Sequence, residues 1–328
     1  MTSGAGSSGY VRLMEHGDVE PHDGRIMAVV GGDGKDVACR PWSPAEVSEV
    51  NVAIVVMSEA TQEFEASLAD DGVGTLTLRN KTMGPAFFDE LERHLDTLEG
   101  RPELRVLLVR GAEDKALSYG LDLPKAFAVW GPMFRGAATA GPRRELRQLV
   151  KKLQRPFDRL AALRVPTICA IHGHCIGGGL DLASACDLRL ASRDAKISLR
   201  ETKIAIVADL GSLQRLPHII GEGLTRELAF TGRDVTAEEA LAMRLVNSVH
   251  DDASSLFAAC EQLARQIAAN SPLVVEGVKV ALNRRVLPQI ADGLDHVATW
   301  NAAFLASEDF AEAFAAFLAK RPPAFKGR

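Results

Sequence analysis

The most constraining feature of the sequence is a run of three glycines, Gly177, Gly178 and Gly179, that follows a β-branched stretch over residues 165–171. The stretch has the length and composition of a buried strand, and an apolar segment suited to a short helix follows the glycines. Glycines let main-chain N–H groups approach a ligand, and the first turn of a helix adds free N–H groups. We therefore expect a polarised oxygen to bind here; a tight turn with no ligand is the simpler alternative.

A second turn-prone stretch lies upstream, where Tyr119, Gly120 and Leu121 follow the apolar run 105–109. Loops that end parallel strands lie along the same edge of a sheet. Two main-chain N–H groups that converge on one carbonyl oxygen form an oxyanion hole, in which each donor stabilises a transition state by ~3 kcal/mol. Phosphate binding is not favoured, because the glycine run matches neither the P-loop pattern nor GxGxxG.

The order of the predicted elements indicates a layered α/β fold. An alternating strand over 74–78, an amphipathic helix over 87–98 and a short buried strand over 105–109 give the pattern β-α-β. Residues 131–144 are predicted as a longer polar segment. Further along, the sequence predicts helices over about 145–163 and 180–185, strands over 165–171, 187–191 and 196–199, and Ala-rich helices after residue 249.

Three regions follow from this pattern. Residues 1–47 are rich in Gly, Ser, Asp and Pro without periodicity, which predicts a flexible N-terminal extension. Residues 48–250 are predicted as the α/β core, and residues 251–328 as a C-terminal helical subdomain.

Composition narrows the class of protein. The chain has 328 residues, is 47% hydrophobic and carries a net charge of −5, which disfavours nucleic-acid binding. It has no apolar run of about 20 residues and no signal-like N-terminus, so we expect a cytoplasmic protein without a membrane partner. Its five cysteines form no CxxC pair, and we expect them to be buried, with no metal site, since the cluster around His172 and His174 lacks a second set of ligands.

The two loops together resemble a known family. The segments from Ser118 to Leu123 and from His172 to Asp181, separated by a long helix, are similar to the two signature loops of the crotonase (enoyl-CoA hydratase/isomerase) superfamily. The resemblance implies a β-β-α superhelix with a C-terminal helical trimerisation region, and a homotrimer or dimer of trimers. It also implies an acyl-CoA thioester as substrate, so that CoA enters as part of the substrate and no separate cofactor is needed. By the same resemblance, the N–H groups of Leu121 and Gly178 bind the thioester oxygen, and the loop residues contacting substrate are Tyr119, Gly120, Gly177 and Gly179.

Three acids indicate which reaction is involved. Asp181 precedes Glu201 by 20 positions (201 minus 181), and Asp209 follows Glu201 by 8 (209 minus 201). Hydratases of the superfamily resemble one another in having Glu at the first two positions and a glycine at the third. The Asp, Glu, Asp set here, followed by Leu-Gly-Ser-Leu-Gln-Arg-Leu-Pro, resembles that of Δ3,5-Δ2,4-dienoyl-CoA isomerases.

Migration of a conjugated diene requires removal of a proton alpha to the thioester and delivery of one at the ε carbon, which two buried acids can perform. We expect Asp209 to serve the α carbon and Glu201 the ε carbon, although the reverse remains open, with Asp181 tuning the pair. Structural roles are the alternatives: a first-turn residue for Asp181, an exposed charge for Glu201 and a helix cap for Asp209. An enoyl-CoA hydratase and a non-catalytic CoA- or RNA-binding homologue are the alternative functions.

Overall fold

The apolar run predicted as a strand around residues 105–109 forms β4 (Val106–Gly111), in the middle of the larger of two sheets. In the part of the chain that the structure describes, the strand order in this sheet is β1-β2-β3-β4-β6-β8-β11. Strands β1 to β3 are antiparallel, and the pairing is parallel from β3 onward. The other strands are β1 (Val55–Ala60), β2 (Phe64–Ala69), β3 (Val73–Leu78), β6 (Thr167–Ile171), β8 (Leu188–Ser192) and β11 (Ser248–His250).

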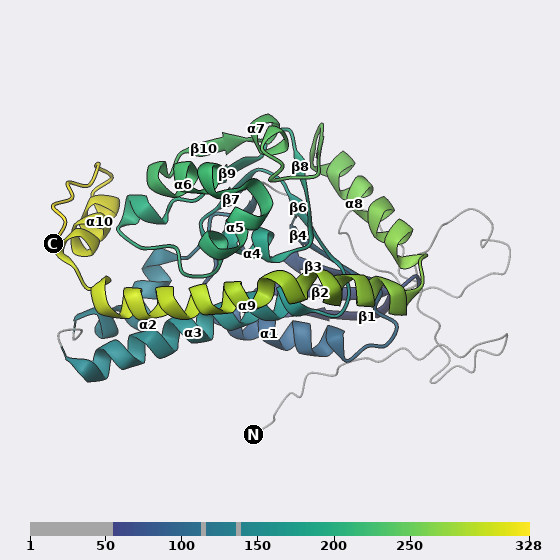
Figure 1. Ribbon diagram of the computed structural model, residues 1–328, viewed down its shortest axis with the longest axis horizontal. Coiled ribbons are helices and arrows are strands. Elements are labelled where there is room, and N and C mark those ends of the chain that lie inside the picture. Colours follow the sequence, from purple (N-terminus) through teal and green to yellow (C-terminus); the bar gives the residue numbers. More distant parts are fainter. Residues whose placement is uncertain (1–54, 113–115, 136–138) are drawn as a thin grey trace, which may run out of the picture. The chain divides into compact units, whose positions relative to one another are not determined.

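The computed structural model describes residues 55–112, 116–135 and 139–328, which are coloured along the sequence in Figure 1. The predicted extension over residues 1–47 and the predicted start of the core at residue 48 lie outside these ranges.

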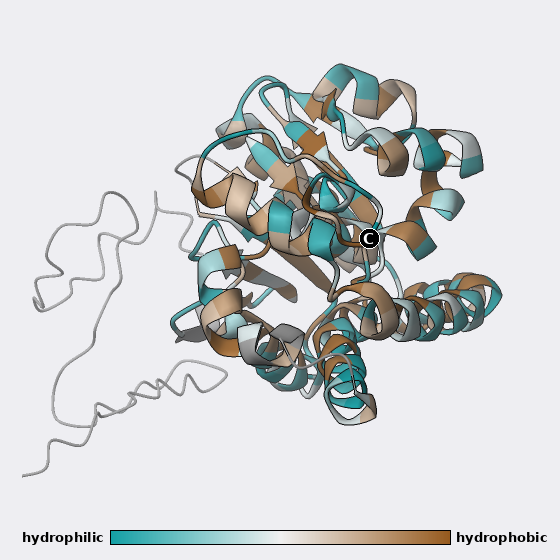
Figure 2. Ribbon diagram, turned by 90° about the vertical axis from the view of Figure 1, so that its left-hand side faces the viewer, coloured by the Kyte–Doolittle hydropathy of each residue, from teal (hydrophilic) through white to brown (hydrophobic). Residues whose placement is uncertain are grey.

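Helices cover both faces of the larger sheet. Alternate residues of β4 point to opposite faces, so Val106 and Leu108 pack with helix α8 (Ala253–Ala268), whereas Leu107 and Val109 belong to the main core on the other face. A parallel sheet buried on both faces needs a continuous apolar strand, which is the pattern that the sequence shows. Figure 2 shows hydrophobic colouring on several inner strands and alternating bands of both colours along the helices.

A second, smaller sheet was not predicted. Within the described residues its order is β10-β9-β7-β5, and its members are only three residues long: β5 (Ala116–Ser118), β7 (His174–Ile176), β9 (Lys196–Ser198) and β10 (Asp234–Thr236). Strands β5, β7 and β9 are parallel, and β10 runs antiparallel to β9. The two glycine-containing loops therefore follow β5 and β7 of this small sheet.

The predicted helices are present, with longer bounds than predicted. The segment 131–144 differs most from the prediction, because α2 continues to Arg135 and α3 begins at Ala140. Between residues 55 and 249, the described helices are α1 (Pro85–Glu99), α2 (Leu123–Arg135), α3 (Ala140–Ala162), α4 (Gly178–Ala185), the 3₁₀ helix η2 (Glu201–Ile204), α5 (Ser212–Ile220), α6 (Glu222–Thr231) and α7 (Ala237–Ala242).

After β11 the described chain is helical, as predicted, with α8, the 33-residue α9 (Pro272–Phe304) and α10 (Glu308–Leu318). Helix α8 shares a buried cluster with the larger sheet, so it belongs to the packing of the core. Helix α9 lies alongside α3 in Figure 1 and also contacts α5. Among the described residues, no helix combines the length and the apolar composition needed to cross a membrane.

Candidate active site

The small sheet brings the predicted site residues together. Its parallel strands β5, β7 and β9 end at one edge, and each is followed directly by a predicted site residue. Leu121 follows β5, Gly178 and Asp181 follow β7, and Glu201 follows β9. Asp209 comes from the segment between η2 and α5. The carboxyl ends of parallel strands are the usual place for a site in an α/β fold.

The two predicted oxyanion donors are neighbours. A Cβ placed on Gly178 would lie 3.8 Å from the Leu121 nitrogen, and one placed on Gly120 would lie 3.2 Å from the Gly178 nitrogen. Met83 donates its N–H to the Gly120 carbonyl and accepts one from Asp122, an arrangement that turns the N–H of the intervening Leu121 to the opposite side. Gly178 is the first residue of α4, where N–H groups have no acceptor within the helix. The two N–H groups are therefore placed to share one oxygen.

Position 177 requires a glycine for two reasons: its backbone conformation and its contact with Glu201. Its φ is +54°, which side-chain-bearing residues rarely adopt. A Cβ at this position would lie 3.0 Å from Oε1 of Glu201, so the absence of a side chain makes room for that carboxyl group. Glu201 is not an exposed charge at a strand end, because its Oε2 atom is buried with no hydrogen-bond partner among the described residues.

Asp181 lies in the first turn of α4 and is 1% exposed. The main-chain N–H of Ser212, the first residue of α5, donates to its Oδ1 atom at 2.6 Å. Asp181 therefore joins the glycine loop to the segment that carries Asp209. Burial raises the pKa of its carboxyl group to about 6, against the opposing effects of the Ser212 N–H and the Arg215 guanidinium.

Asp209 does not cap the helix that follows it. Helix α5 begins at Ser212 after Gly211, and the Asp209 carboxylate instead accepts a hydrogen bond from Nδ2 of Asn301 at 2.7 Å. The main-chain carbonyl of Asp209 accepts another from Nε2 of Gln154 at 2.8 Å. The alternative of a cap for this residue is therefore wrong in the structure.

The three acids influence one another electrostatically. Burial, the negative charge of Asp181 and, to a smaller extent, that of Asp209 together raise the pKa of Glu201 to about 8. Burial likewise raises the pKa of Asp209 to about 7, where the Asn301 amide opposes the rise and the charge of Asp181 adds to it. A buried group of carboxyls with separated pKa values can hold one proton donor and one acceptor at the same pH.

Tyr119 and Gly179 have packing contacts beside the oxyanion donors. The Tyr119 ring stacks on His174 with centroids 4.8 Å apart and is 41% exposed. A Cβ on Gly179 would lie 3.0 Å from Cβ of Ser118, so this glycine allows α4 to approach the loop after β5. The Ser118 hydroxyl accepts the N–H of Gly120 at 3.0 Å, which fixes the turn before Leu121.

The sequence did not predict the residues that bind the acids or the segments that carry them. Gln154 and Asn301 lie on α3 and α9 and give no local signal, because isolated amides on long helices are common on solvated faces. Arg215 is buried on α5, where it donates to the Leu210 carbonyl and pairs with Asp158 at 2.6 Å. The expected burial of the cysteines is confirmed for the four in the described residues, whereas Cys39 lies outside them.

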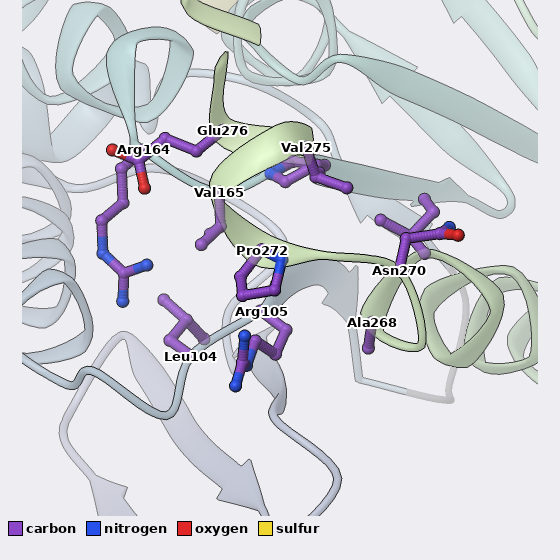
Figure 3. Close-up of a pocket in the computed structure, with 11 residues that line it drawn as sticks. Leu104, Arg105, Arg164, Val165, Ala268, Asn270, Pro272, Val275 and Glu276 are labelled. Atoms are coloured by element: carbon purple, nitrogen blue, oxygen red, sulfur yellow. The ribbon is translucent and has the colours of Figure 1, made fainter. Parts of the chain in front are cut away.

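A hollow shown in Figure 3 lies at the other end of the parallel strands. It is lined by Leu104 and Arg105, just before β4, and by Arg164 and Val165, just before β6, together with the turn between α8 and α9. None of the three candidate acids lines it, so this hollow is separate from the site.

Comparison with known proteins places the chain in a family. Residues 69–328 match the model of the enoyl-CoA hydratase/isomerase family. A mitochondrial Δ(3,5)-Δ(2,4)-dienoyl-CoA isomerase of Dictyostelium discoideum is 42% identical over 75% of this chain and 83% of its own length. A peroxisomal enzyme of the same name from Arabidopsis thaliana is 40% identical over 73% of this chain and 86% of its own.

Solved structures agree on the fold. An enoyl-CoA hydratase from Bacillus anthracis superposes with a TM-score of 0.61 at 29% identity, covering 81% of this chain and 100% of that one. One from Mycobacterium avium subsp. paratuberculosis K-10 gives 0.69 at 22% identity, over 81% and 100%, a likeness of fold. The chain belongs to the enoyl-CoA hydratase/isomerase family and has the crotonase fold expected from its loops.

Proposed function

We propose that this protein is a Δ3,5-Δ2,4-dienoyl-CoA isomerase. The observation that carries the proposal is that the carboxyl groups of Asp181, Glu201 and Asp209 interact with one another beside the N–H groups of Leu121 and Gly178. The relatives from Dictyostelium discoideum and Arabidopsis thaliana, which bear this name, support it.

In the proposed reaction Asp209 takes a proton from the α carbon of a 3,5-dienoyl-CoA. The C–H electron pair forms a double bond between the α carbon and the thioester carbon as the C=O pair moves to the thioester oxygen, which accepts hydrogen bonds from the N–H groups of Leu121 and Gly178. The dienolate then collapses toward the ε carbon, where Glu201 delivers a proton and the double bonds come to rest at positions 2 and 4. One proton is taken up and one is released by the enzyme, so no water or cofactor is consumed.

The pKa values support this division of roles. At neutral pH Glu201, with a pKa of about 8, holds a proton to give, whereas Asp209, with a pKa of about 7, is ionised in a substantial fraction of molecules. Asp181, at about 6, is the acid that ionises first, and its charge helps to keep Glu201 protonated. Asp181 thus tunes the other two acids.

The test compares two substrates. Purified protein is incubated with a 3,5-dienoyl-CoA and separately with a 2-enoyl-CoA, and both reactions are followed by absorbance. We expect diene migration without hydration; strong hydration without migration would make the protein a hydratase.

Asp209→Asn should lower kcat by about a hundredfold to ten thousandfold, whereas Asp295→Asn, an exposed exchange on α9, should leave it unchanged. Thioester binding without turnover, unaffected by Asp209→Asn, would indicate a non-catalytic homologue.

The same proposal includes a homotrimer or a dimer of trimers. Apolar side chains at the start of α9 support it, because Leu273 is 81% exposed, Val274 63% and Val278 54%. Exposed apolar side chains gathered on one element are typical of subunit contacts. Sedimentation at several protein concentrations tests it, and a monomer throughout would refute it.

A further inference from the structure

Asn301 is a buried amide near the end of α9. It is 2% exposed, whereas its neighbour Trp300 is 46% exposed. A polar side chain at this depth needs hydrogen-bond partners, since an unpaired one costs free energy. The partners of Asn301 both belong to the segment that carries Asp209.

The hydrogen bonds of Asn301 fix its orientation. Its Nδ2 donates to Oδ2 of Asp209 at 2.7 Å and to the main-chain carbonyl of Val207 at 2.8 Å. An amide nitrogen has two hydrogens, and both are used here. The reversed amide would place its oxygen against two other acceptors, so Asn301 faces Asp209 as a donor.

We propose that Asn301 is a positioning residue for Asp209: it holds the carboxylate in one orientation and stabilises its ionised form, so that α9 determines how strong a base Asp209 is. The inference rests on the proposed function, in which Asp209 removes the α proton. A hydrogen bond to a carboxylate favours the charged form and is stronger than one between neutral groups.

Gln154 shows what a purely structural amide does at the same residue. Its Nε2 donates to the main-chain carbonyl of Asp209 at 2.8 Å and to that of Leu294 on α9 at 3.0 Å. Gln154 therefore connects α3 with α9 and with the segment that carries Asp209, but it does not contact the Asp209 carboxylate. Asn301 differs because one of its hydrogens meets the group that titrates.

None of the charged groups around Asp209 in the described residues donates a hydrogen bond to its carboxylate, whereas Asn301 does. Asp181 on α4 acts on it with negative charge, Glu201 on η2 is an acid whose own pKa Asp209 helps to raise, and Arg215 on α5 is directed to Asp158 and Leu210. On α9 the nearest titratable residue in sequence is His296, which lines a surface hollow together with Val207. Asn301 is accordingly the side chain that opposes the rise in the Asp209 pKa.

Loss of the donor should change catalysis in a specific way. Without the amide, the pKa of Asp209 rises further, and a smaller fraction is ionised at neutral pH. The acid limb of the kcat/KM profile should move up by about one pH unit. We expect kcat to fall by about tenfold to a hundredfold, with little change in KM, since Asn301 does not touch the substrate.

The matched variants lie on one helix. Asn301→Leu removes the donor and keeps the volume; Asn283→Leu is the control, because Asn283 also lies on α9 and donates to the Ala161 carbonyl at 3.1 Å, away from the acids. Asn301→Ser is the milder second variant should the leucine prevent folding. Asn301 variants should shift the acid limb, and Asn283→Leu should not. An acid limb that stays in place in a folded Asn301 variant would overturn the proposal.

A second measurement does not depend on activity. The raised pKa of Asp209 contributes stability below its unfolded value that is lost as the pH rises through about 7. A further rise in Asn301→Leu should make the loss of Tm relative to wild type larger at pH 9 than at pH 5, whereas the loss in Asn283→Leu should be equal at both. An equal loss in Asn301→Leu would show a structural role only. If wild type fails to isomerise dienes, the proposed function fails, and this measurement still decides the role of Asn301.

Discussion

The candidate active site is built from two kinds of chemical group. The first kind, on the thioester side, consists of main-chain N–H groups from the loops after β5 and β7, and the second, the acid side, consists of three carboxyls from α4, η2 and the segment before α5. Main-chain donors do not titrate, and they depend on sequence mainly through the glycines that let the loops approach. The carboxyls depend on residue identity, burial and one another.

This difference separates what the family shares from what one member does. Any reaction that passes through a thioester enolate requires hydrogen bonds to the enolate oxygen. The main-chain N–H groups of the thioester side can therefore serve hydratases and isomerases equally. The number and protonation of the acids decide whether water is added or a proton is moved. Substitutions on the two sides should therefore have different pH signatures.

The largest effect is expected on the acid side. Glu201→Gln keeps the shape but cannot deliver a proton, so kcat should fall by about a hundredfold to ten thousandfold, with KM nearly unchanged. Initial rates at saturating 3,5-dienoyl-CoA measure this. Glu222→Gln, an exposed exchange on α6, is the control. A Glu201→Gln enzyme with wild-type kcat would remove this acid from the mechanism.

The thioester side can be tested by a pair of variants. Gly178→Pro removes one N–H at the first helical position, where proline is tolerated, and Gly178→Ala adds a side-chain carbon 3.0 Å from the Met83 sulfur while keeping the N–H. The proline variant should be slower than the alanine variant by about a hundredfold to a thousandfold. Its pH profile should keep the wild-type shape. Equal rates for the two variants would argue against this donor.

Asp181→Asn should move the pH profile without abolishing activity. Removing its charge lowers the pKa values of both Glu201 and Asp209, so the bell-shaped kcat/KM profile should shift to lower pH, by about one unit. The measurement covers pH 5 to 10 with 3,5-dienoyl-CoA. A shift to higher pH, or none, would contradict the tuning role of Asp181.

The smallest effect is expected at Tyr119. Tyr119→Ala removes the stacking on His174, which should lower the free energy of unfolding by about 0.5–1.5 kcal/mol. The pH profile should not change, because the ring lies on the side that does not titrate. Denaturant unfolding measures the stability, and a displaced pH profile would show that the two sides are coupled.

The sequence predicted the elements whose signal is local. The buried strand over 105–109 and the glycine run at 177–179 are recognisable from a few adjacent residues. Of the small sheet only β9 was predicted as a strand, because the other strands of three residues are too short to show alternation. Helix α2 was not predicted, and its last residues fall in the segment 131–144 that was predicted as polar.

The sequence predicted the residues of the candidate site, but it did not predict the residues that hold them in position. The three acids were recognised because they and their spacing resemble those of dienoyl-CoA isomerases, but the sequence could not show that their carboxyl groups interact with one another. Asn301 lies 92 residues from Asp209 in sequence, and only the packing of α9 brings the two together. Contacts of this range depend on the whole fold.

The most direct test of the two-acid mechanism is a single turnover of 3,5-dienoyl-CoA in deuterium oxide. Glu201 exchanges its proton with the solvent before substrate binds, and Asp209 keeps the proton it removes. The product should therefore be a 2,4-dienoyl-CoA with one deuterium at the ε carbon, located by mass spectrometry and NMR. A product without deuterium would mean that one acid carries the same proton between the two carbons, and addition of deuterium oxide would mean that the enzyme is a hydratase.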